Sequence, residues 1–273
     1  MAMNKHLATL SVVLLAVILA AWKYWDYINN PWTRDGVVRA YVIQVTPRVS
    51  GPVVEIPIVE NQAVKAGDLL FRIDPRTFKE DLDKAEAQAV QATGDFERAN
   101  ELIARGDISK RNADKATADY NVAISNREQA RLNLEFTEVR APVDGYITNL
   151  DLRVGSQVVA NNPEMALVDT GSYWVNGYFR ETMIEHIDAG DPAIVTLMTY
   201  PDTPITGTVE SIGWGIARQD GSTSYELLPA ISPTFSWIRL AQRVPVRIKL
   251  DPLPAGIQLR VGTTASVLVK AGS

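Results

Sequence analysis

The sequence predicts a mainly β protein that carries an α-helical hairpin and begins with an N-terminal transmembrane helix. Three observations lead to this fold class. They are an apolar run near the N-terminus, a short motif that occurs twice, and a stretch of helical periodicity between its two copies. Side chains alternate with a period of two along strands and near 3.6 along helices, so the change of period marks a change of structure.

The N-terminal segment is predicted to anchor the chain in a membrane. Apolar residues run from Leu7 to Trp22 without a charge, and Lys23 and Trp25 follow. This run is slightly shorter than the ~20 residues of a spanning helix, but lysine can snorkel and tryptophan favours the membrane interface. A cleaved signal peptide is the alternative, which the bulky aromatic residues and the lack of a small-x-small site disfavour. Lys5, as the basic flank, predicts a cytoplasmic N-terminus.

A repeated motif predicts two halves of one β-sandwich. Residues 47–58 and 141–152 align at Gly51 and Gly145, and both copies have apolar residues two, five and seven positions after the glycine. Short alternating runs separated by Gly and Asn are typical of strands and tight turns. One half is too small to bury a core alone, so the copies are expected to pair. We interpret both glycines as structural residues that allow tight turns.

Between the repeats, the periodicity predicts an antiparallel coiled-coil hairpin. The first helix has mostly alanine at its contact positions, which permits close approach of a second helix: Phe78, Leu82, Ala85, Ala89, Ala92, Phe96, Ala99 and Ile103. Asp74 and Pro75 are expected to begin this helix, and Gly106 to end it. The second helix has a similar seam that Arg127 interrupts without an evident reason. At 1.5 Å per residue the arm is roughly 45 Å long.

Strand periodicity returns after residue 173 and predicts a small β-barrel, interrupted by a loop-rich stretch from Gly213 to Ser236. Two leftover runs, 37–45 and 259–269, are predicted to pair as a membrane-proximal β module. The predicted division is an anchor at 1–28, this module at 29–45 and 251–273, sandwich halves at 46–74 and 138–170, the hairpin at 75–137 and the barrel at 171–250.

No catalytic, metal-binding or cofactor-binding set is visible in the sequence. His6 and His186 have no partner at metal-ligand spacing, and neither a nucleophile elbow nor a phosphate-binding glycine loop is present. The chain has no cysteine, which excludes disulfides and thiolate chemistry. A net charge of −5 offers no electrostatic basis for binding nucleic acid. The sequence therefore predicts a protein that is not an enzyme.

The order of these parts resembles the HlyD-type membrane fusion proteins over essentially the whole chain. Four stretches carry the resemblance, the last most specifically: Pro31–Asp35, Pro47–Gly51, Arg140–Leu150 and Trp237–Ile248. They are most similar to the adaptor subunit of aromatic carboxylic acid (p-hydroxybenzoic acid) efflux pumps, although the hairpin is short for that subfamily. The resemblance implies a lipoyl-like fold for the sandwich.

The resemblance also implies partners and a docking site. The chain would be a periplasmic adaptor that links an inner-membrane transporter to an outer-membrane exit duct and joins further copies in a ring, expected to be a hexamer. Family members that dock on an exit duct carry Arg, Leu and Ser near the hairpin tip, spaced four and then seven residues apart, and Arg98, Leu102 and Ser109 have this spacing. Each also has a simpler explanation, as a solvated charge, a packing residue and a helix N-cap.

Three other functions stay open at this point. The chain could serve a major-facilitator multidrug pump instead of an aromatic-acid exporter. A lipoyl or biotinyl carrier shares the half-sandwich repeat, but here the 74–137 segment stands where a carrier presents its modifiable lysine. A membrane-tethered structural protein without a role in transport is the third.

Overall fold

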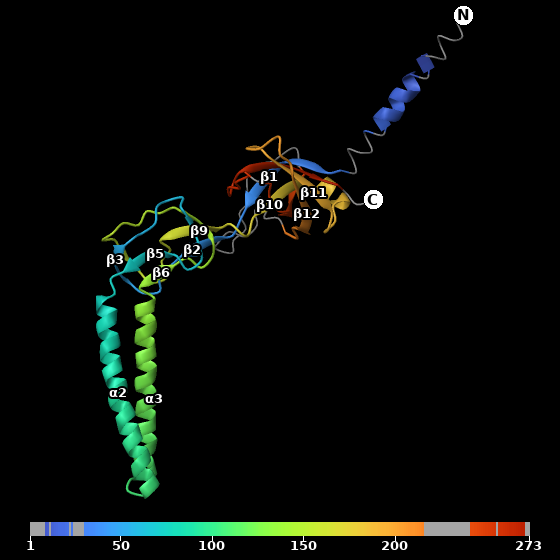
Figure 1. Cartoon of the computed structure of the whole chain (residues 1–273). Coiled ribbons are helices and arrows are strands. Elements are labelled where there is room, and N and C mark those ends of the chain that lie inside the picture. The colour runs from blue at the N-terminus through green and yellow to red at the C-terminus, as the bar shows by residue number, and fades with distance from the viewer. Residues whose placement is uncertain are drawn as a thin grey trace, which may run out of the picture. The chain divides into compact units, whose positions relative to one another are not determined.

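The computed structural model describes residues 9–10, 12–21, 23, 30–215, 241–254 and 256–270. The chain forms two compact units (Figure 1). One unit combines Met1–Ala40 with Ser172–Ser273, and the other is Tyr41–Gly171. The chain thus contributes to the first unit, builds the second, and then returns to complete the first.

The described residues 9–10, 12–21 and 23 are helical. Apolar side chains of this segment, from Val12 to Leu19, are exposed over more than half of their surface. Within the part of the chain that the structure describes, no helix combines the length and the apolarity that a bilayer crossing needs. Of the predicted anchor residues, Lys23 is helical, whereas Leu7, Trp22 and Trp25 lie outside the described residues.

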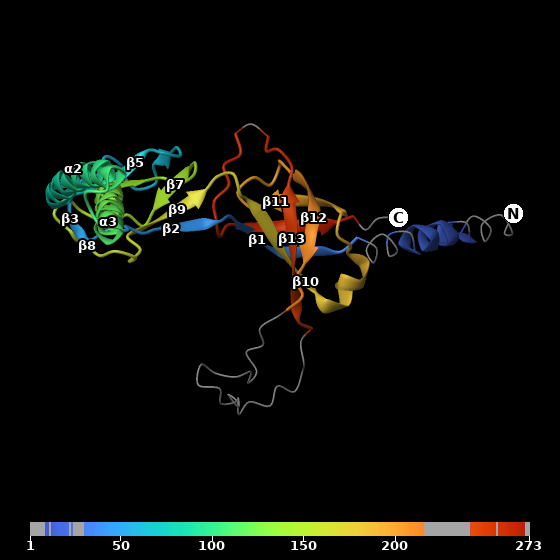
Figure 2. The same ribbon diagram turned by 90° about the horizontal axis from the view of Figure 1, so that it is seen from below.

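The first unit is built on a closed antiparallel barrel (Figure 2). Its strands, in order around the barrel, are β1 (Trp32–Arg39), β10 (Trp174–Arg180), β13 (Arg243–Leu250), β12 (Ile205–Ile212), β11 (Pro192–Leu197) and β14 (Thr264–Val269). A 3₁₀ helix, η1 (Glu181–His186), follows β10. Alternate residues point inward, as Val246 and Ile248 of β13 show by being completely buried.

The predicted separate membrane-proximal module is wrong. β1 and β14 do pair, with Trp32 opposite Leu268. However, β1 also pairs with β10 and β14 with β11, so the two strands close the barrel. The strand β2 (Val42–Val45), which the prediction placed in the same module, belongs to the second unit. The physical reason is that the four strands from β10 to β13 alone would leave two unpaired edges, which the terminal strands cover.

The second unit contains a sandwich of two four-stranded sheets. Their strand orders are β2-β9-β7-β4 and β6-β5-β3-β8. The remaining strands are β3 (Gly51–Glu55), β4 (Ala63–Val64), β5 (Leu69–Ile73), β6 (Glu138–Arg140), β7 (Gly145–Thr148), β8 (Gln157–Val158) and β9 (Met165–Asp169). Each sheet takes strands from both repeats, and their residues form one core. The predicted pairing of the two halves is therefore confirmed.

The two repeat glycines occupy equivalent places in the sandwich. Gly51 lies opposite Val158, and Gly145 lies opposite Val64, so the glycine of each half pairs with a valine of the other half. The prediction that they form tight turns is wrong, because both begin strands. A Cβ atom at Gly51 would lie 2.6 Å from the Ile73 side chain, and one at Gly145 would lie 2.3 Å from a backbone oxygen. Close approach of neighbouring strands therefore requires glycine here.

The hairpin consists of α2 (Arg76–Arg105) and α3 (Lys110–Glu135), which run side by side away from the sandwich (Figure 1). The buried residues of both helices are all alanines: Ala85, Ala89, Ala99, Ala113 and Ala123. Phe96 and Tyr120 stack across the seam with their ring centroids 4.8 Å apart. The N-cap of α2 is Pro75, one residue later than predicted, and the Asp74 carboxylate accepts a hydrogen bond from the backbone N–H of Arg76.

Candidate docking site

The turn between α2 and α3 brings the three predicted docking residues to one end of the hairpin. Gly106 ends α2 in the left-handed conformation with φ of 79°, as predicted. Its N–H donates to the carbonyl of Ile103 at 3.0 Å, and the N–H of Asp107 donates to that of Leu102 at 2.9 Å. These two hydrogen bonds close the C-terminal turn of α2 and satisfy two carbonyl groups that the helix itself leaves without a partner. Arg98 and Leu102 precede the turn by two turns of helix and one, and Ser109 follows it.

Arg98 lies along its own helix. Its guanidinium forms an ion pair with Asp95, and its side chain is 68% exposed. It also passes over Gly94, where an added Cβ would stand 3.3 Å from a guanidinium nitrogen. An exposed pair of this kind contributes about 0–1 kcal/mol, so a partner's carbonyl or carboxylate groups could capture the guanidinium at little cost.

Leu102 contributes to the surface of the tip, whereas Ser109 has a structural role. Leu102 and its neighbour Ile103 are each 37% exposed, which makes the tip an apolar knob. Ser109 is the N-cap of α3, and its Oγ accepts a hydrogen bond from the N–H of Asn112 at 3.3 Å. The simpler explanation for Ser109 is thus confirmed, although its hydroxyl proton can still be donated to a partner.

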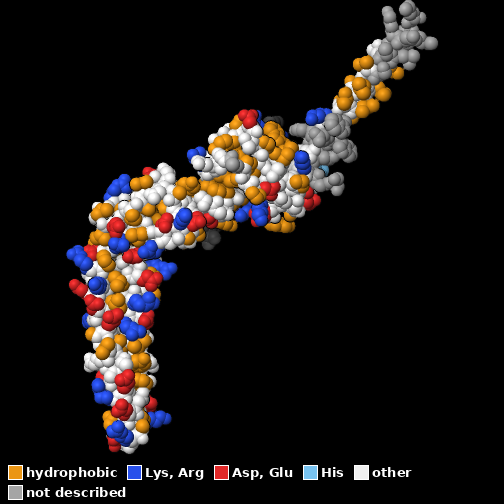
Figure 3. All heavy atoms as spheres, in the orientation of Figure 1, with side chains coloured by type: hydrophobic (Ala, Val, Ile, Leu, Met, Phe, Trp, Pro, Cys, Tyr) orange, Lys and Arg blue, Asp and Glu red, His pale blue; other side chains and the backbone are white. Residues whose placement is uncertain are grey.

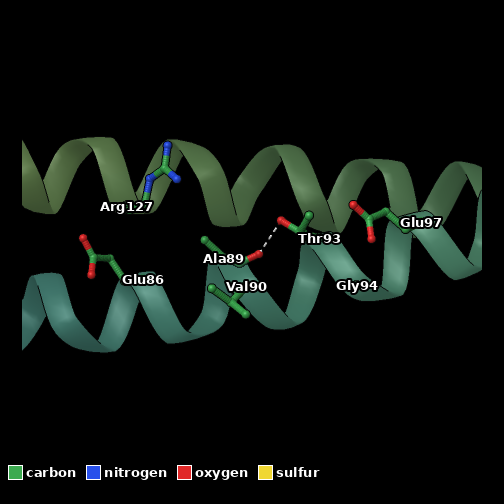
Figure 4. A pocket seen from close by; sticks show the side chains of 7 residues that line it. All are labelled: Glu86, Ala89, Val90, Thr93, Gly94, Glu97 and Arg127. Atoms are coloured by element: carbon green, nitrogen blue, oxygen red, sulfur yellow. Dashed lines mark hydrogen bonds between the residues drawn. The ribbon is translucent and has the colours of Figure 1, made fainter.

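Sequence reasoning left Arg127 unexplained, and the structure shows where it lies. Arg127 projects from α3 beside an open groove of about 510 Å³ along the hairpin (Figure 4). The α2 side of this groove consists of Glu86, Ala89, Val90, Thr93, Gly94 and Glu97. Small residues in α2 leave the space that the long arginine stem needs, while its guanidinium donates to Glu128 at 3.1 Å. A charge at a seam position, across from Ala89 in Figure 4, was the signal in the sequence.

Charges stabilise the hairpin on both helices and at its base. Figure 3 shows acidic and basic side chains along its visible face. Hydrogen bonds from Arg131, and then from Arg127, hold the pKa of the Glu128 carboxyl below its ordinary value. At the base, Arg72 contacts Glu55 at 2.8 Å and Glu138 at 3.4 Å. No group of His, Cys, Asp and Glu side chains within the described ranges could hold a metal ion.

Comparisons with known proteins agree with the division into units. Residues 41–170 match the family model described as RND MFP, barrel-sandwich hybrid domain, and residues 172–270 match the AAEA-like beta-barrel domain. The chain is 40% identical to the uncharacterized protein YdhJ of Escherichia coli K12, over 97% of each chain. It is 33% identical to the multidrug resistance protein MdtN of Shigella flexneri, over 94% of each chain.

Solved structures show the same fold. A MacA-MexA chimeric protein with the Pseudomonas aeruginosa MexA α-hairpin has a TM-score of 0.69 at 23% identity, covering 89% of this chain and 82% of that one. A putative efflux transporter from Bacteroides eggerthii has a TM-score of 0.67 at 23% identity, covering 89% of this chain and 70% of the other. The combination of sandwich, hairpin and barrel is therefore shared.

Proposed function

The chain belongs to the membrane fusion protein family of efflux-pump adaptors, and from this membership we propose that it is a periplasmic adaptor held at the inner membrane by its N-terminal segment. In this function it links an inner-membrane transporter to an outer-membrane exit duct. The sandwich and barrel stack with further copies in a six-membered ring, and the hairpins reach the duct. The transporter supplies the energy, since the sequence contains no nucleotide-binding loop.

The observation that carries this proposal is the construction of the hairpin. Its helices of 30 and 26 residues bury only alanines, so most of their surface faces outward. Its tip presents Leu102 and Ile103 to solvent and holds Arg98 by a single exposed ion pair. Such an arm gains little by packing against its own chain, and its exposed end is suited to contact with another protein.

A carrier function is less well supported. In a lipoyl or biotinyl domain the modified lysine lies in the turn between the two halves. Here β5 ends at Ile73 and β6 begins at Glu138, and the whole hairpin lies between them. An intact-mass measurement without a lipoyl or biotinyl increment would agree with this interpretation.

For the exported compound we propose aromatic carboxylic acids. The support is the resemblance of the stretches at Arg140–Leu150 and Trp237–Ile248 to adaptors of such pumps. A multidrug pump is the second candidate, favoured by the 33% identity to MdtN. A deletion strain separates the two candidates: aromatic-acid export predicts hypersensitivity to p-hydroxybenzoate, and a multidrug pump predicts hypersensitivity to unrelated drugs. Unchanged sensitivity to both would favour a structural protein without a role in transport.

The docking site is tested by charge reversal at the tip. Arg98→Asp is expected to abolish export while abundance and the helical circular dichroism signal stay unchanged, because the side chain is exposed. Lys79→Asp makes the same reversal on α2 near the sandwich and is the matched control, expected to export normally. Unchanged export by Arg98→Asp would remove the tip assignment but not the adaptor function. Loss of export in both variants would show a general effect of hairpin charge.

A further inference from the structure

At one end of the barrel, the start of β1 lies beside the ends of its neighbours β10 and β14. Arg180, the last residue of β10, lies opposite Arg243, the first residue of β13. Trp32 lies opposite Leu268 near the end of β14, and Ile212 at the end of β12 lies opposite Val246. Trp32 and the residues that directly follow Ile212 are therefore at the same end, which we call the entry rim. The chain connects to the second unit at the other end.

Two tryptophans project from the entry rim. Trp214 is fully exposed, and Trp32 is 47% exposed. The position of Trp214 is set by its neighbour, since the N–H of Gly213 donates to the carbonyl of Pro245 at 2.8 Å. A Cβ atom at Gly213 would lie 2.7 Å from the Pro245 ring, so this close approach requires glycine. A fully exposed indole ring such as that of Trp214 forgoes a burial of roughly 150–250 Å², and Trp32 forgoes about half as much, which indicates a partner.

The covalent chain limits what can cover this rim. Eight residues lie between Lys23, at the end of the helical apolar segment, and Trp32, so nine Cα-to-Cα steps join the two. A fully extended chain of that length spans at most about 30 Å. The apolar side chains from Val12 to Leu19 are more than half exposed and require an apolar environment. If this segment lies in a bilayer, as the proposed function states, the bilayer surface is within reach of the entry rim.

The charges of the entry rim distinguish lipid from an acidic or basic protein surface. Arg243 forms an ion pair with Asp35. In the part of the chain that the structure describes, the other charged side chains of the rim nearly balance, with Arg34, Arg180 and Lys270 against Glu181, Glu185, Asp188 and the half-buried Asp191. A nearly balanced rim has little net attraction for a surface of either sign, whereas tryptophan favours the headgroup boundary of a bilayer regardless of lipid charge.

We propose that the entry rim rests on the membrane surface, with Trp32 and Trp214 as interfacial anchors. This inference depends on the proposed membrane attachment and adds an orientation to it. The N-terminal segment restricts the barrel to the vicinity of the bilayer, and the two rings determine which end faces it. Two anchoring points and the tether together limit rotation of the barrel.

The test uses the absence of cysteine from the chain. A cysteine at Gly215 retains Trp214, and its Cβ would meet no atom within 4 Å, so the substitution is tolerated. The full-length Gly215→Cys variant is labelled with a nitroxide at its single cysteine. The labelled protein is then reconstituted in vesicles of phosphatidylcholine alone and in vesicles that also contain phosphatidylglycerol. Collision rates with oxygen, which partitions into lipid, and with a water-soluble nickel chelate report the depth of the label. Met198→Cys is the control, an exposed apolar site at the opposite end of the barrel.

The collision rate of the nickel chelate with the label at 215 is expected to be about fivefold lower than with the label at 198. This ratio should be the same in both vesicle types. Trp214→Ser in the Gly215→Cys background should return the access to that of the control. A label at 215 that stays in water overturns the inference. Burial only in vesicles with phosphatidylglycerol also overturns it, because the contact would then depend on lipid charge. Burial that comes with dipolar broadening overturns it as well, because the covering surface would then be a second copy of the chain. A Leu15→Cys label tests the attachment separately. If it lies in lipid while 215 stays in water, only the inference fails, whereas a Leu15 label in water contradicts the proposed attachment itself.

Discussion

The sandwich buries large side chains, whereas the hairpin that grows from it buries only small ones. Phe71, Leu70 and Ile147 of the sandwich are completely excluded from solvent. In α2 and α3 the buried residues are alanines. Burying a large apolar side chain contributes ~1.5–3 kcal/mol, and an alanine methyl contributes far less. The hairpin is therefore long and mostly exposed to solvent, while most of the stability of this unit resides in the sandwich.

The strongest test of this difference is a truncation in the sandwich core. Phe71→Ala should lower the stability of the sandwich by about 3–5 kcal/mol, since it removes a fully buried ring and leaves a cavity. Hydrogen exchange of β5 and β3 would measure the loss. All six tryptophans lie outside residues 41–171, so tryptophan fluorescence follows the other unit and should show an unchanged transition. A loss below about 1 kcal/mol would contradict the assigned core.

Enlarging the helical seam should have a smaller effect. Ala89→Leu is expected to cost roughly 1–3 kcal/mol, because Ala89 is only 2% exposed and the added atoms would displace the Arg127 side chain that lines the same groove. Circular dichroism at 222 nm during thermal unfolding would report this loss. The neighbouring Val90 is exposed, so Val90→Leu should change the transition little. Equal effects at both positions would contradict an alanine-packed seam.

Two glycines of the hairpin should respond with opposite signs. Gly106→Ala places a side chain at φ of 79° and should destabilise the tip by about 1 kcal/mol. Gly94→Ala lies within α2, where alanine favours the helix by about 0.5–1 kcal/mol, provided that the Arg98 side chain moves slightly. Hydrogen exchange of the backbone amides at positions 106 and 107, compared between the variant and the original chain, would locate the first effect. The same sign at both positions would contradict the described turn.

Acid should weaken the hairpin slightly through Glu128. Hydrogen bonds from Arg131 and Arg127 lower its pKa from the ordinary 4.5. The folded state then binds this proton less readily than the unfolded state. The stabilisation is present above pH 4.5 and is lost as the pH falls through the lower, folded pKa. Glu128→Gln should reduce the difference in hairpin melting between about pH 7 and about pH 3. An unchanged difference would show that other carboxylates account for the acid effect.

Local features of the candidate site were predictable from the sequence. Gly106 ends α2 and Ser109 begins α3, because caps depend on a few neighbouring residues. The ion pair of Arg98 with Asp95 and the groove beside Arg127 were not predicted. An arginine can reach several carboxylates, and the rotamer that it adopts depends on the space left by residues such as Gly94. Side-chain direction is therefore a tertiary property even on a regular helix.

The sequence by itself determined the periodicities, and with them the alanine seam, the alternating strands and the repeat that splits the sandwich. Only the tertiary structure decided which strands are neighbours. β1 and β14, more than 200 residues apart in the chain, close the barrel, and Gly51 and Gly145 each lie opposite a valine of the other repeat. The physical reason is that a side chain's period is a local property of the backbone, whereas strand pairing depends on which edges remain unsatisfied once the whole chain has folded.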